Sequence, residues 1–427
     1  MLKVTHISLH QQGGGAAIAS LRIHQALKNY GSNFGIDSHL RVRYGSGGDS
    51  SIHVGPPRGV NPLWLRLQPR LTSLYRRGFT SCYPITHSIA EPSTGLGREL
   101  RLSDSDLINL HWLGDQMLSI EEIGSLSHPI IWTLHDQWPF SGAEHYEYLN
   151  LQPPARYQQG YTANNRPEKE HGPDLCRRTW ERKHRSWRRP FTIVCPSQWL
   201  ANCVRSSSLM SNWPVHVIPL PIDTDVWRPI GKRHARAALG LPQNVPMLAF
   251  GAMGGNQVHH KGGDLLLEAL HLLCKDDIDE ALSGLQLIVF GQNTPTSSLP
   301  LPIPVHYLGI LQDPISMRLI YSAADLVVVP SRIEAFGQVA LEAQSCGTAV
   351  ASFAIGGLLD IVANRISGVH AEAFDTHSLA MAIRWSLAKP DRAMKLGEEG
   401  RRRALQRSSQ DVVASQYAKL YHSISKT

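Results

Sequence analysis

The chain has 427 residues, of which 42% are hydrophobic and 18% charged, the composition of a globular protein with two or three domains. Its formal net charge of +7 is mild for this length, and no basic block with interleaved aromatic residues predicts a nucleic-acid groove. Six cysteines are scattered without Cys-x-x-Cys spacing, so we predict reduced thiols and neither a zinc site nor a disulfide framework.

The sequence carries no sign of a targeting or membrane-spanning segment. No apolar run approaches the ~20 residues that cross a bilayer, and the first three residues lead straight into a strand. We therefore expect a cytoplasmic protein. Its mild positive charge is compatible with peripheral contact at the inner face of a membrane.

The first segment has the pattern of a Rossmann-like unit. A strand over residues 2–9 leads to a glycine turn and then to a helix over residues 16–30. Ile18 stands where the dinucleotide fingerprint requires a third Gly or Ala, so that fingerprint is absent. Gly14 and Gly15 would let a phosphate or a sugar approach the helix N-terminus, although a simple tight turn explains them equally well.

Two stretches of the first half give weak signals. Residues 45–105 include a basic, leucine-containing stretch at 66–77, which fits either a solvated helix face or an amphipathic element that meets an acceptor or an anionic lipid surface. Residues 151–175 are long and polar and fit an insertion or a lid. A basic helix is predicted after them, over residues 176–189.

Two buried strands in the first half each end in a histidine. The strands cover residues 106–111 and 129–135, so His111 and His135 stand at their carboxyl ends, where ligands bind in open α/β sheets. Asp136 follows directly. A histidine at a strand end can also be structural, and for His111 the two readings weigh equally.

In the second half, a strand over residues 247–251 leads through a glycine-rich loop to Lys261 and then to a helix. A lysine that enters a helix after such a loop is suited to clamp a phosphate by charge and geometry. No Ser or Thr follows it, so the loop is not a Walker A motif. The neighbouring His259-His260 pair is not a metal-binding pattern by itself.

The clearest motif is LVVVPSRIEAFGQVALEAQSCGTAVASF at residues 326–353, which predicts a buried strand, a loop, a helix and a second strand. Glu334 lies in the loop, and Glu342 lies eight residues later on the helix. Between them Ala335, Phe336 and Gly337 lead into the helix N-terminus, whose amides favour an anion. Two carboxylates that flank an anion site fit a nucleotide-sugar. The alternative is that both are solvated carboxylates on an ordinary helix with no role in binding.

These motifs together resemble the retaining family 4 glycosyltransferases, also described as glycosyl transferases group 1. The stretch WTLHDQWPFSGAEHY is similar to a subgroup that builds surface polysaccharides. The resemblance implies a GT-B fold, α/β, with two Rossmann-like doubly wound domains facing a cleft. It places an acceptor-side domain at 1–220, a nucleotide-sugar donor-binding domain at 221–405, and a C-terminal helix at 406–427 that packs back on the first domain.

The resemblance also implies roles for the candidate residues. Glu334, His135 and Lys261 would be catalytic, with Glu334 and His135 on the transferred sugar and Lys261 on the donor phosphates. Asp136 would be an acceptor-side hydrogen-bond partner or base, with His111 nearby. Donor binding would further use the ribose contact of Glu342, the diphosphate-binding amides near Phe336, and the glycine loop, giving the set Gly14, Gly15, Ala335, Phe336, Gly337 and Glu342.

The reaction implied is transfer of a hexosyl group from a UDP- or GDP-linked sugar to a glycan or polyprenyl-linked acceptor, without a cofactor. No Asp-x-Asp motif stands at a strand end, so we predict no metal. The family often carries an Arg near the donor phosphates, and here Ala252 and His260 occupy those places, which leaves charge compensation weaker or supplied by His260. Two alternatives stay open: a GT-B-fold sugar-nucleotide epimerase and a non-catalytic nucleotide-sugar binding protein.

Overall fold

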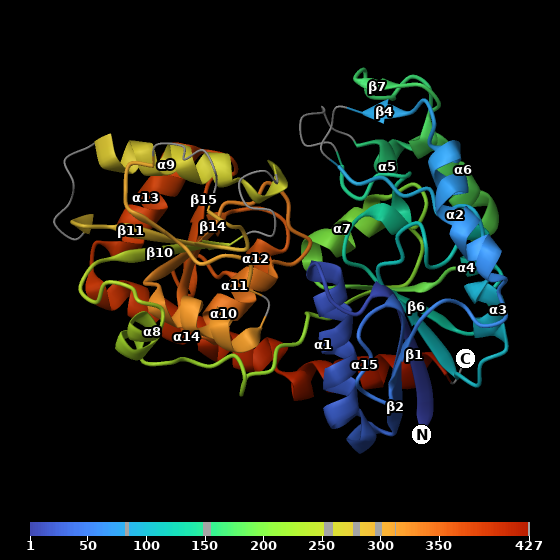
Figure 1. Ribbon diagram of the computed structural model, residues 1–427, viewed down its shortest axis with the longest axis horizontal. Helices are drawn as coiled ribbons and strands as arrows, with labels where there is room; N and C mark the ends of the chain where they lie inside the picture. Colours follow the sequence, from blue (N-terminus) through green and yellow to red (C-terminus); the bar gives the residue numbers. More distant parts are fainter. Residues whose placement is uncertain are drawn as a thin grey trace. The chain divides into compact units, whose positions relative to one another are not determined.

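The computed structural model describes residues 1–81, 85–147, 155–251, 259–275, 282–294, 301–311 and 313–425. The chain forms two compact units, one built from Met1–Pro219 with Val413–Thr427 and the other from Leu220–Val412 (Figure 1). Each unit is a Rossmann-like α/β fold around its own parallel sheet, which confirms the fold class predicted from the sequence.

The sheet of unit 1 has the strand order β3-β2-β1-β5-β6-β8-β9, with every neighbouring pair parallel. Its central strands are short, apolar and buried on both faces, as parallel strands between helical layers require. The strands are β1 (Leu2–His10), β2 (Ile36–Tyr44), β3 (Ile52–Val54), β5 (Leu107–Leu110), β6 (Ile130–Thr133), β8 (Thr192–Cys195) and β9 (Val215–Val217).

Helices and two short strands complete unit 1. The helices are α1 (Gly15–Tyr30), α2 (Pro62–Tyr75), α3 (Leu96–Arg101), α4 (Ile120–Gly124), α5 (Arg156–Gln159), α6 (Leu175–Ser186) and α7 (Gln198–Ser206). The strands β4 (Thr80–Ser81) and β7 (Glu170–His171) pair antiparallel, which ties the two stretches with weak sequence signals to each other. The basic helix expected at 176–189 corresponds to α6.

Helix α2 has an unusual orientation for its composition. It covers the basic stretch that the sequence singled out, yet its buried residues are the polar Gln68 and Thr72. Three of its leucines are exposed, namely Leu63, Leu67 and Leu74, with exposed fractions of 64%, 47% and 56%. The helix therefore presents apolar and basic side chains outward together.

The C-terminal helix expected at 406–427 corresponds to α15 (Gln410–Ile424), and the extended Ser409 separates it from α14 (Pro390–Ser408). Helix α15 packs against unit 1. The Tyr421 hydroxyl accepts a hydrogen bond from Asn109 at 2.8 Å, and the Tyr417 hydroxyl lies 3.2 Å from Thr133 Oγ1. The end of the chain thus covers strands β5 and β6 of the N-terminal sheet.

The sheet of unit 2 has the order β12-β11-β10-β13-β14-β15 and is also parallel throughout. Its strands are β10 (Met247–Gly251), β11 (Gln286–Phe290), β12 (Val305–Tyr307), β13 (Leu326–Val329), β14 (Ala349–Phe353) and β15 (Gly368–Ala371). Its other helical elements are α8 (Lys232–Ala238), η4 (His259–Lys261), α9 (Gly263–Lys275), α10 (Pro314–Ala323), α11 (Gln338–Ser345), α12 (Leu358–Ile361) and α13 (Thr376–Leu387).

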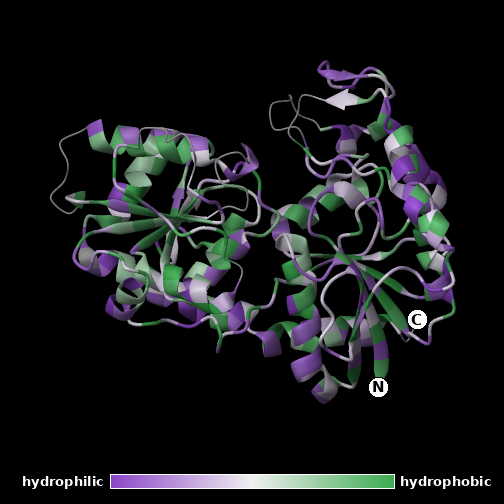
Figure 2. Ribbon diagram, in the orientation of Figure 1, coloured by the Kyte–Doolittle hydropathy of each residue, from purple (hydrophilic) through white to green (hydrophobic). Residues whose placement is uncertain are grey.

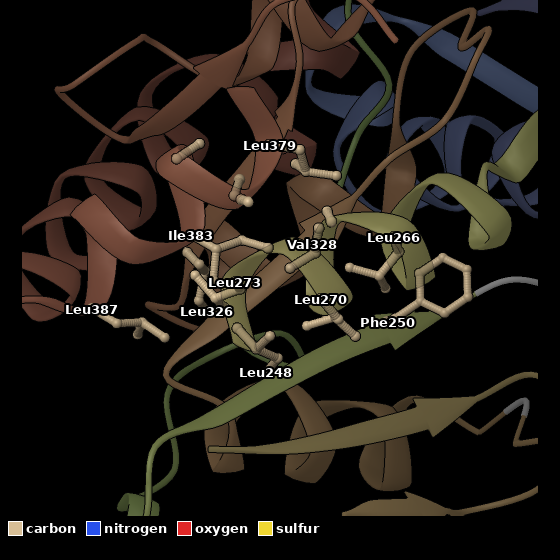
Figure 3. Packing of buried hydrophobic residues seen from close by; sticks show 14 of the residues in the cluster. Leu248, Phe250, Leu266, Leu270, Leu273, Leu326, Val328, Leu379, Ile383 and Leu387 are labelled. Atoms are coloured by element: carbon tan, nitrogen blue, oxygen red, sulfur yellow. The ribbon is translucent and has the colours of Figure 1, made fainter. Parts of the chain in front are cut away.

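The core of unit 2 explains why α9 forms where it does. Leu266, Leu270 and Leu273 recur at helical spacing and face the sheet, where they join Leu248 and Val328 of the central strands (Figure 3). Helix α13 closes the same cluster. Burial of these side chains fixes α9 against β10 and β13, and with it the short segment that enters α9.

Hydrophobic residues concentrate on the strands of both sheets, whereas the surrounding helices carry both hydrophobic and hydrophilic residues (Figure 2). Across the described residues, no helix is both long enough and apolar enough to cross a bilayer.

Candidate functional site

The loop that follows β13 leads into α11 and forms an anion-accepting edge in unit 2. Gly337 is the N-cap of α11 with a φ of +105°, a conformation that a residue with a side chain rarely adopts. A Cβ there would also lie 2.7 Å from Leu358. No side chain caps the helix, and no acidic residue stands in its first turn. The positive end of the α11 dipole therefore favours a negatively charged ligand.

Lys261 and Glu334 form an ion pair at this edge. The Lys261 ammonium lies 2.5 Å from Glu334 Oε1, and Ser331 Oγ lies 3.0 Å from the same oxygen. Both side chains are mostly buried, with exposed fractions of 27% and 15%. The lysine predicted to clamp phosphate and the carboxylate predicted to contact the sugar thus occupy one small region of unit 2.

Glycine and arginine contacts hold Lys261 in place. Gly262 has a φ of +70°, and a Cβ there would lie 1.8 Å from the carbonyl oxygen of Pro330. The Arg332 guanidinium binds both carboxylate oxygens of Asp264 in α9, at 2.8 and 2.5 Å, which holds the pKa of Asp264 below its usual value. The Arg332 amide also donates to the His260 carbonyl. The segment that carries Lys261 is therefore fixed against the end of β13.

A second glycine pair closes the loop from the other side. Gly357 donates its N–H to the Glu334 carbonyl at 2.8 Å. A Cβ on Gly356 would lie 2.3 Å from that carbonyl oxygen, and one on Gly357 would lie 2.5 Å from the Phe336 Cα. The backbone of residues 334–336 is thus packed against the turn after β14, which preorganises the loop before any ligand arrives.

Glu342 lies on α11 and is buried. Its Oε2 accepts a hydrogen bond from the Tyr321 hydroxyl at 2.8 Å, and only 7% of the residue is exposed. Tyr321, on α10, is fully buried. The carboxylate is therefore held in one orientation by a partner that the sequence did not reveal.

His260, which the sequence left open as a source of positive charge, has a lowered pKa in the ligand-free protein. Burial, the adjacent Lys261 and His259 lower its pKa to about 4, against a smaller opposing effect of Glu334. Its imidazole is therefore neutral at pH 7. Ala252, the other position considered, lies outside the described residues.

In unit 1, the glycine turn lies between β1 and α1. Gly14 is the N-cap of α1 with a φ of +100°, and no side chain caps the helix. Gln11 Oε1 accepts hydrogen bonds from the amides of Ser46 and Gly47, at 3.0 and 3.2 Å, which joins this turn to the loop after β2. Gly14 and Gly15 thus lie at the carboxyl edge of the unit 1 sheet, where a ligand can meet the amino end of α1.

The two predicted strand-end histidines contact each other and a third. His111 Nδ1 lies 3.0 Å from His135 Nε2, and His111 Nε2 lies 2.9 Å from His6 Nδ1. The rings stack pairwise with centroids 5.3 and 5.2 Å apart. Burial lowers the pKa of all three, that of His135 to about 4.

Asp136 makes its hydrogen bonds to other residues of unit 1 and is not exposed at the carboxyl edge of the sheet. Its Oδ2 accepts from Trp112 Nε1 at 2.8 Å and lies 2.6 Å from His145 Nδ1, while its Oδ1 accepts from the Trp138 amide at 3.0 Å. Only 6% of the residue is exposed. This geometry fits a carboxylate that holds the loop after β6 better than one that accepts a proton from a substrate.

Unit 1 also has a surface cavity of about 690 Å³ between α2 and the loop after β5. Three arginines line it, Arg70, Arg76 and Arg77, together with Asp115 and the exposed Leu74. Arg76 lies 3.5 Å from Asp115, whereas Arg70 and Arg77 are exposed. The cavity carries excess positive charge and suits an anionic ligand.

Among the residues that the structure describes, one group has the spacing of metal ligands: His87, Glu170 and Cys176, all buried. The Glu170 carboxylate lies 3.8 Å from His87 Nε2 and 3.9 Å from the Arg166 guanidinium. A carboxylate between two potential cations is the pattern of a buried charge network. We therefore assign no metal to it.

Sequence reasoning missed three contributors to these two edges. They are His6, Tyr321 and the Arg332–Asp264 pair, which touch the predicted residues from other elements. The only sequence signal for them was the position of Arg332 within the recognised loop and of Asp264 in the first turn of α9.

Comparisons with known proteins find a similarity for each unit. A family model described as Glycosyltransferase Family 4 matches residues 55–226, and one described as Glycosyl transferases group 1 matches residues 238–403. Most of unit 1 and most of unit 2 are therefore similar to domains of known glycosyltransferases.

Two curated relatives show how much of the chain the sequence similarity covers. The D-inositol 3-phosphate glycosyltransferase of Segniliparus rotundus is 35% identical over 196 residues, 44% of this chain and 42% of the relative. The alpha-maltose-1-phosphate synthase of Mycolicibacterium smegmatis is 32% identical over 230 residues, 49% of this chain and 57% of the relative. The chain thus spans about half the length of the curated relatives it matches.

Solved structures resemble the whole chain. A sucrose-phosphate synthase from Thermosynechococcus elongatus aligns with a TM-score of 0.66 at 19% identity, covering 99% of both chains. Anabaena Alr3699/HepE in complex with UDP-glucose aligns with a TM-score of 0.65 at 16% identity, covering 99% of this chain and 100% of that one. At these identities the likeness establishes the fold.

Proposed function

We propose that the chain is a retaining glycosyltransferase that moves a hexosyl group from a UDP- or GDP-linked sugar to a sugar-containing acceptor. One observation carries the proposal: Lys261 and Glu334 meet beside the amino end of α11, which no side chain caps. A diphosphate needs a cation and amide donors, and the sugar beside it needs a carboxylate to accept its hydroxyl protons. The two matched domain families support the same reading.

The proposed chemistry is a front-face displacement. The bond between the sugar C1 and the diphosphate oxygen breaks, and a bond from C1 to the acceptor oxygen forms on the same face. The acceptor proton passes to the departing phosphate oxygen. Lys261 and the amides near Phe336 stabilise the charge that develops on the leaving group, and His135 contacts the transferred sugar. No protein nucleophile is required, consistent with the engagement of Glu334 and Asp136 by neighbouring side chains.

No metal is needed in this scheme, because Lys261 and the α11 dipole supply the positive charge. The test is a thermal-shift panel of UDP-glucose, UDP-N-acetylglucosamine, GDP-mannose and the free nucleotides, in EDTA and then in magnesium. A ligand that binds only the folded state raises Tm. A selective shift in EDTA supports the donor site, whereas shifts that appear only with magnesium contradict the metal-free scheme.

Catalysis is then tested with the donor that shifts Tm. Proton NMR of the product from an α-linked donor should show an α-glycosidic bond. Conversion of the donor without an acceptor to an isomeric sugar nucleotide would instead indicate an epimerase. Binding with neither transfer nor hydrolysis would indicate a non-catalytic binding protein.

For the acceptor we propose a molecule that bears phosphate near the hydroxyl to be glycosylated. The arginine-lined cavity between α2 and the loop after β5 supports this, as do the names of the two relatives, a D-inositol 3-phosphate glycosyltransferase and an alpha-maltose-1-phosphate synthase. Polyprenyl-diphosphate-linked sugars, the precursors of surface polysaccharides, satisfy the same chemistry. Parallel assays with inositol phosphate, glucose 1-phosphate and a short polyprenyl-diphosphate sugar distinguish these acceptors.

We also propose that the protein acts in the cytoplasm and meets the inner face of the membrane through α2. Its exposed leucines with neighbouring arginines are the combination that binds anionic lipid surfaces. Sedimentation with vesicles of phosphatidylglycerol and phosphatidylcholine tests this. Binding to the anionic vesicles should fall when Leu63 and Leu67 are both replaced by Ser, and equal binding by that variant would contradict the proposal.

A further inference from the structure

Three imidazoles form a hydrogen-bonded chain across three adjacent strands of unit 1. His6 lies within β1, His111 follows β5, and His135 follows β6, and these strands are neighbours in the order β1-β5-β6. The two nitrogen–nitrogen distances of 2.9 and 3.0 Å each require one proton between the rings. The proposed function uses His135 alone, so the other two rings need an explanation.

The protons in this chain have two possible arrangements when every ring is neutral. Each neutral imidazole carries one N–H, and His111 faces a partner with both of its nitrogens. Either His6 and His111 both donate from Nδ1, which puts the His135 proton on Nδ1, or all the donors reverse, which puts the His6 proton on Nε2. A mixed arrangement would give His111 two protons or none.

The surroundings of His6, at the buried end of the imidazole chain, select between the two proton arrangements. His6 is fully buried, and its Nε2 has no hydrogen-bond partner within the described part of the chain. The neighbouring His24 ring cannot serve it, because its two nitrogens contact Ser38 and Ser51. An orphaned buried N–H is rarer and costlier in proteins than an under-used acceptor. The arrangement with a bare nitrogen at His6 Nε2 is therefore the stable one.

We propose that His6 and His111 are positioning residues that hold His135 as the tautomer protonated on Nδ1, so that it presents an N–H donor to an oxygen of the transferred sugar. This rests on the proposed function. Because His6 Nε2 is buried and has no hydrogen-bond partner among the described residues, the three imidazoles give protons no path to solvent at that end. His135 Nε2 already accepts from His111, so His135 acts as a fixed neutral donor and not as a general base.

The first test reads the tautomers directly and does not depend on turnover. The full-length protein is labelled with ¹⁵N-histidine, and two-bond proton–nitrogen correlations assign the protonated nitrogen of each ring. His6→Asn, His111→Asn and His135→Asn identify the signals by their loss. We expect Nδ1–H on all three rings at pH 7.5. Nε2–H on His135 would overturn the proposal, whether or not the protein transfers sugar.

The second test uses matched variants of His111. Asn places its amide N–H where Nδ1–H stands and keeps the donor to His135, whereas Leu fills the buried space without a donor. With the donor chosen by thermal shift, His111→Leu should lower kcat about tenfold, the loss of one hydrogen bond, with little change in KM, and His111→Asn should restore most of it. In His111→Leu the His135 signals should show mixed tautomers.

The outcomes separate the proposals from each other. Equal kcat in His111→Leu and the unchanged protein would overturn the positioning role while leaving the transferase assignment intact. The predicted tautomers in a protein that transfers no sugar would leave the chain established and the proposed function wrong. If His111→Leu fails to fold, the tautomers of the unchanged protein still decide the question, because Nδ1–H on His135 supports the proposal and Nε2–H overturns it.

Discussion

Lys261 and Glu334 are 73 residues apart in the sequence, and in unit 2 their charged groups lie 2.5 Å apart. The pair joins the segment that enters α9 to the loop that enters α11. In the ligand-free protein each group thus satisfies the other. Under the proposed function, a diphosphate would compete with Glu334 for the lysine, and the sugar would then satisfy the carboxylate. Donor and sugar recognition would be coupled through this ion pair.

The coupling predicts opposite effects on binding and turnover in Glu334→Gln. Removing the carboxylate removes both the competitor for Lys261 and a negative charge beside the diphosphate. Free UDP or GDP should therefore bind about three- to tenfold tighter, as expected for the loss of one partly exposed ion pair. Transfer should fall sharply, because the sugar loses a charged acceptor and keeps only one neutral amide oxygen. Isothermal titration calorimetry measures the first effect, and product formation measures the second.

Glu398→Gln, an exposed position on α14, is the matched control for this experiment and should change neither quantity. Weaker nucleotide binding by Glu334→Gln would contradict the competition, since it would mean that Glu334 supports Lys261 in the bound state. Lys261→Ala should weaken nucleotide binding and lose most transfer while the fold persists.

Substitution of two glycines with similar backbone conformations tests how much the position of Lys261 depends on close packing. Gly262 and Gly240 have φ values of +70° and +65°, but a Cβ at 240 meets nothing within 4 Å, while one at 262 meets the Pro330 carbonyl. Gly240→Ala should cost about 1 kcal/mol from the left-handed backbone alone. Gly262→Ala should cost more and should also weaken nucleotide binding. Chemical denaturation and calorimetry compare them, and equal losses of stability would show that the segment yields at Pro330.

The sequence predicted the elements around Glu334 because their signals are local. An apolar run, a glycine at each end of the helix and a lysine before a glycine pair each specify a strand, a turn or a helix entry by themselves. The contacts of Tyr321 with Glu342 and of His6 with His111 depend on which strands are neighbours and on their register. A single histidine within an apolar strand is otherwise indistinguishable from a core residue.

Residues 45–105 show that the sequence alone also could not predict which side chains of a surface helix are exposed. The sequence showed a basic, leucine-containing stretch there, which fitted either a solvated helix face or an amphipathic element, and α2 covers most of it. Its buried face is polar, with Gln68 accepting from Arg43 and Thr72 donating to the Glu91 carbonyl. These partners come from distant segments, so the outward orientation of the leucines could not be derived from helical periodicity. The arginine-lined cavity follows from the same packing.

For the arginine-lined cavity we predict that substitutions change KM for the acceptor and leave nucleotide affinity unchanged. Replacing Arg70 and Arg77 together by Ser removes two exposed positive charges from its lining. For a phosphorylated acceptor, KM should rise about tenfold or more, while nucleotide affinity stays unchanged. Steady-state kinetics at two ionic strengths measures this, because added salt should weaken the unchanged protein more than the variant. Arg98→Ser, an exposed site on α3, should leave KM unaltered.

If the double variant instead loses nucleotide affinity, the cavity belongs to donor binding. If KM is unchanged for every phosphorylated acceptor, the anionic-acceptor proposal is wrong.

The buried histidines of unit 1 predict a loss of stability on mild acidification. Burial lowers the pKa of His24 from 6.5 to about 4, and the pKa values of His6 and His111 are also lowered. The folded protein therefore keeps these rings neutral, while the unfolded chain takes up protons as the pH falls below about 6.5. Stability is fully present above that pH and is lost towards pH 4, by about 3 kcal/mol for His24 alone.

Urea unfolding between pH 7.5 and 4.5 measures the free energy of unfolding, and His24→Asn should flatten this dependence relative to the unchanged protein. His377→Asn, at an exposed position on α13, should leave the slope as it is. An unchanged slope in His24→Asn would mean that this ring is protonated in the folded state with its two serine neighbours as acceptors, and would remove the basis for treating the buried imidazoles of unit 1 as neutral.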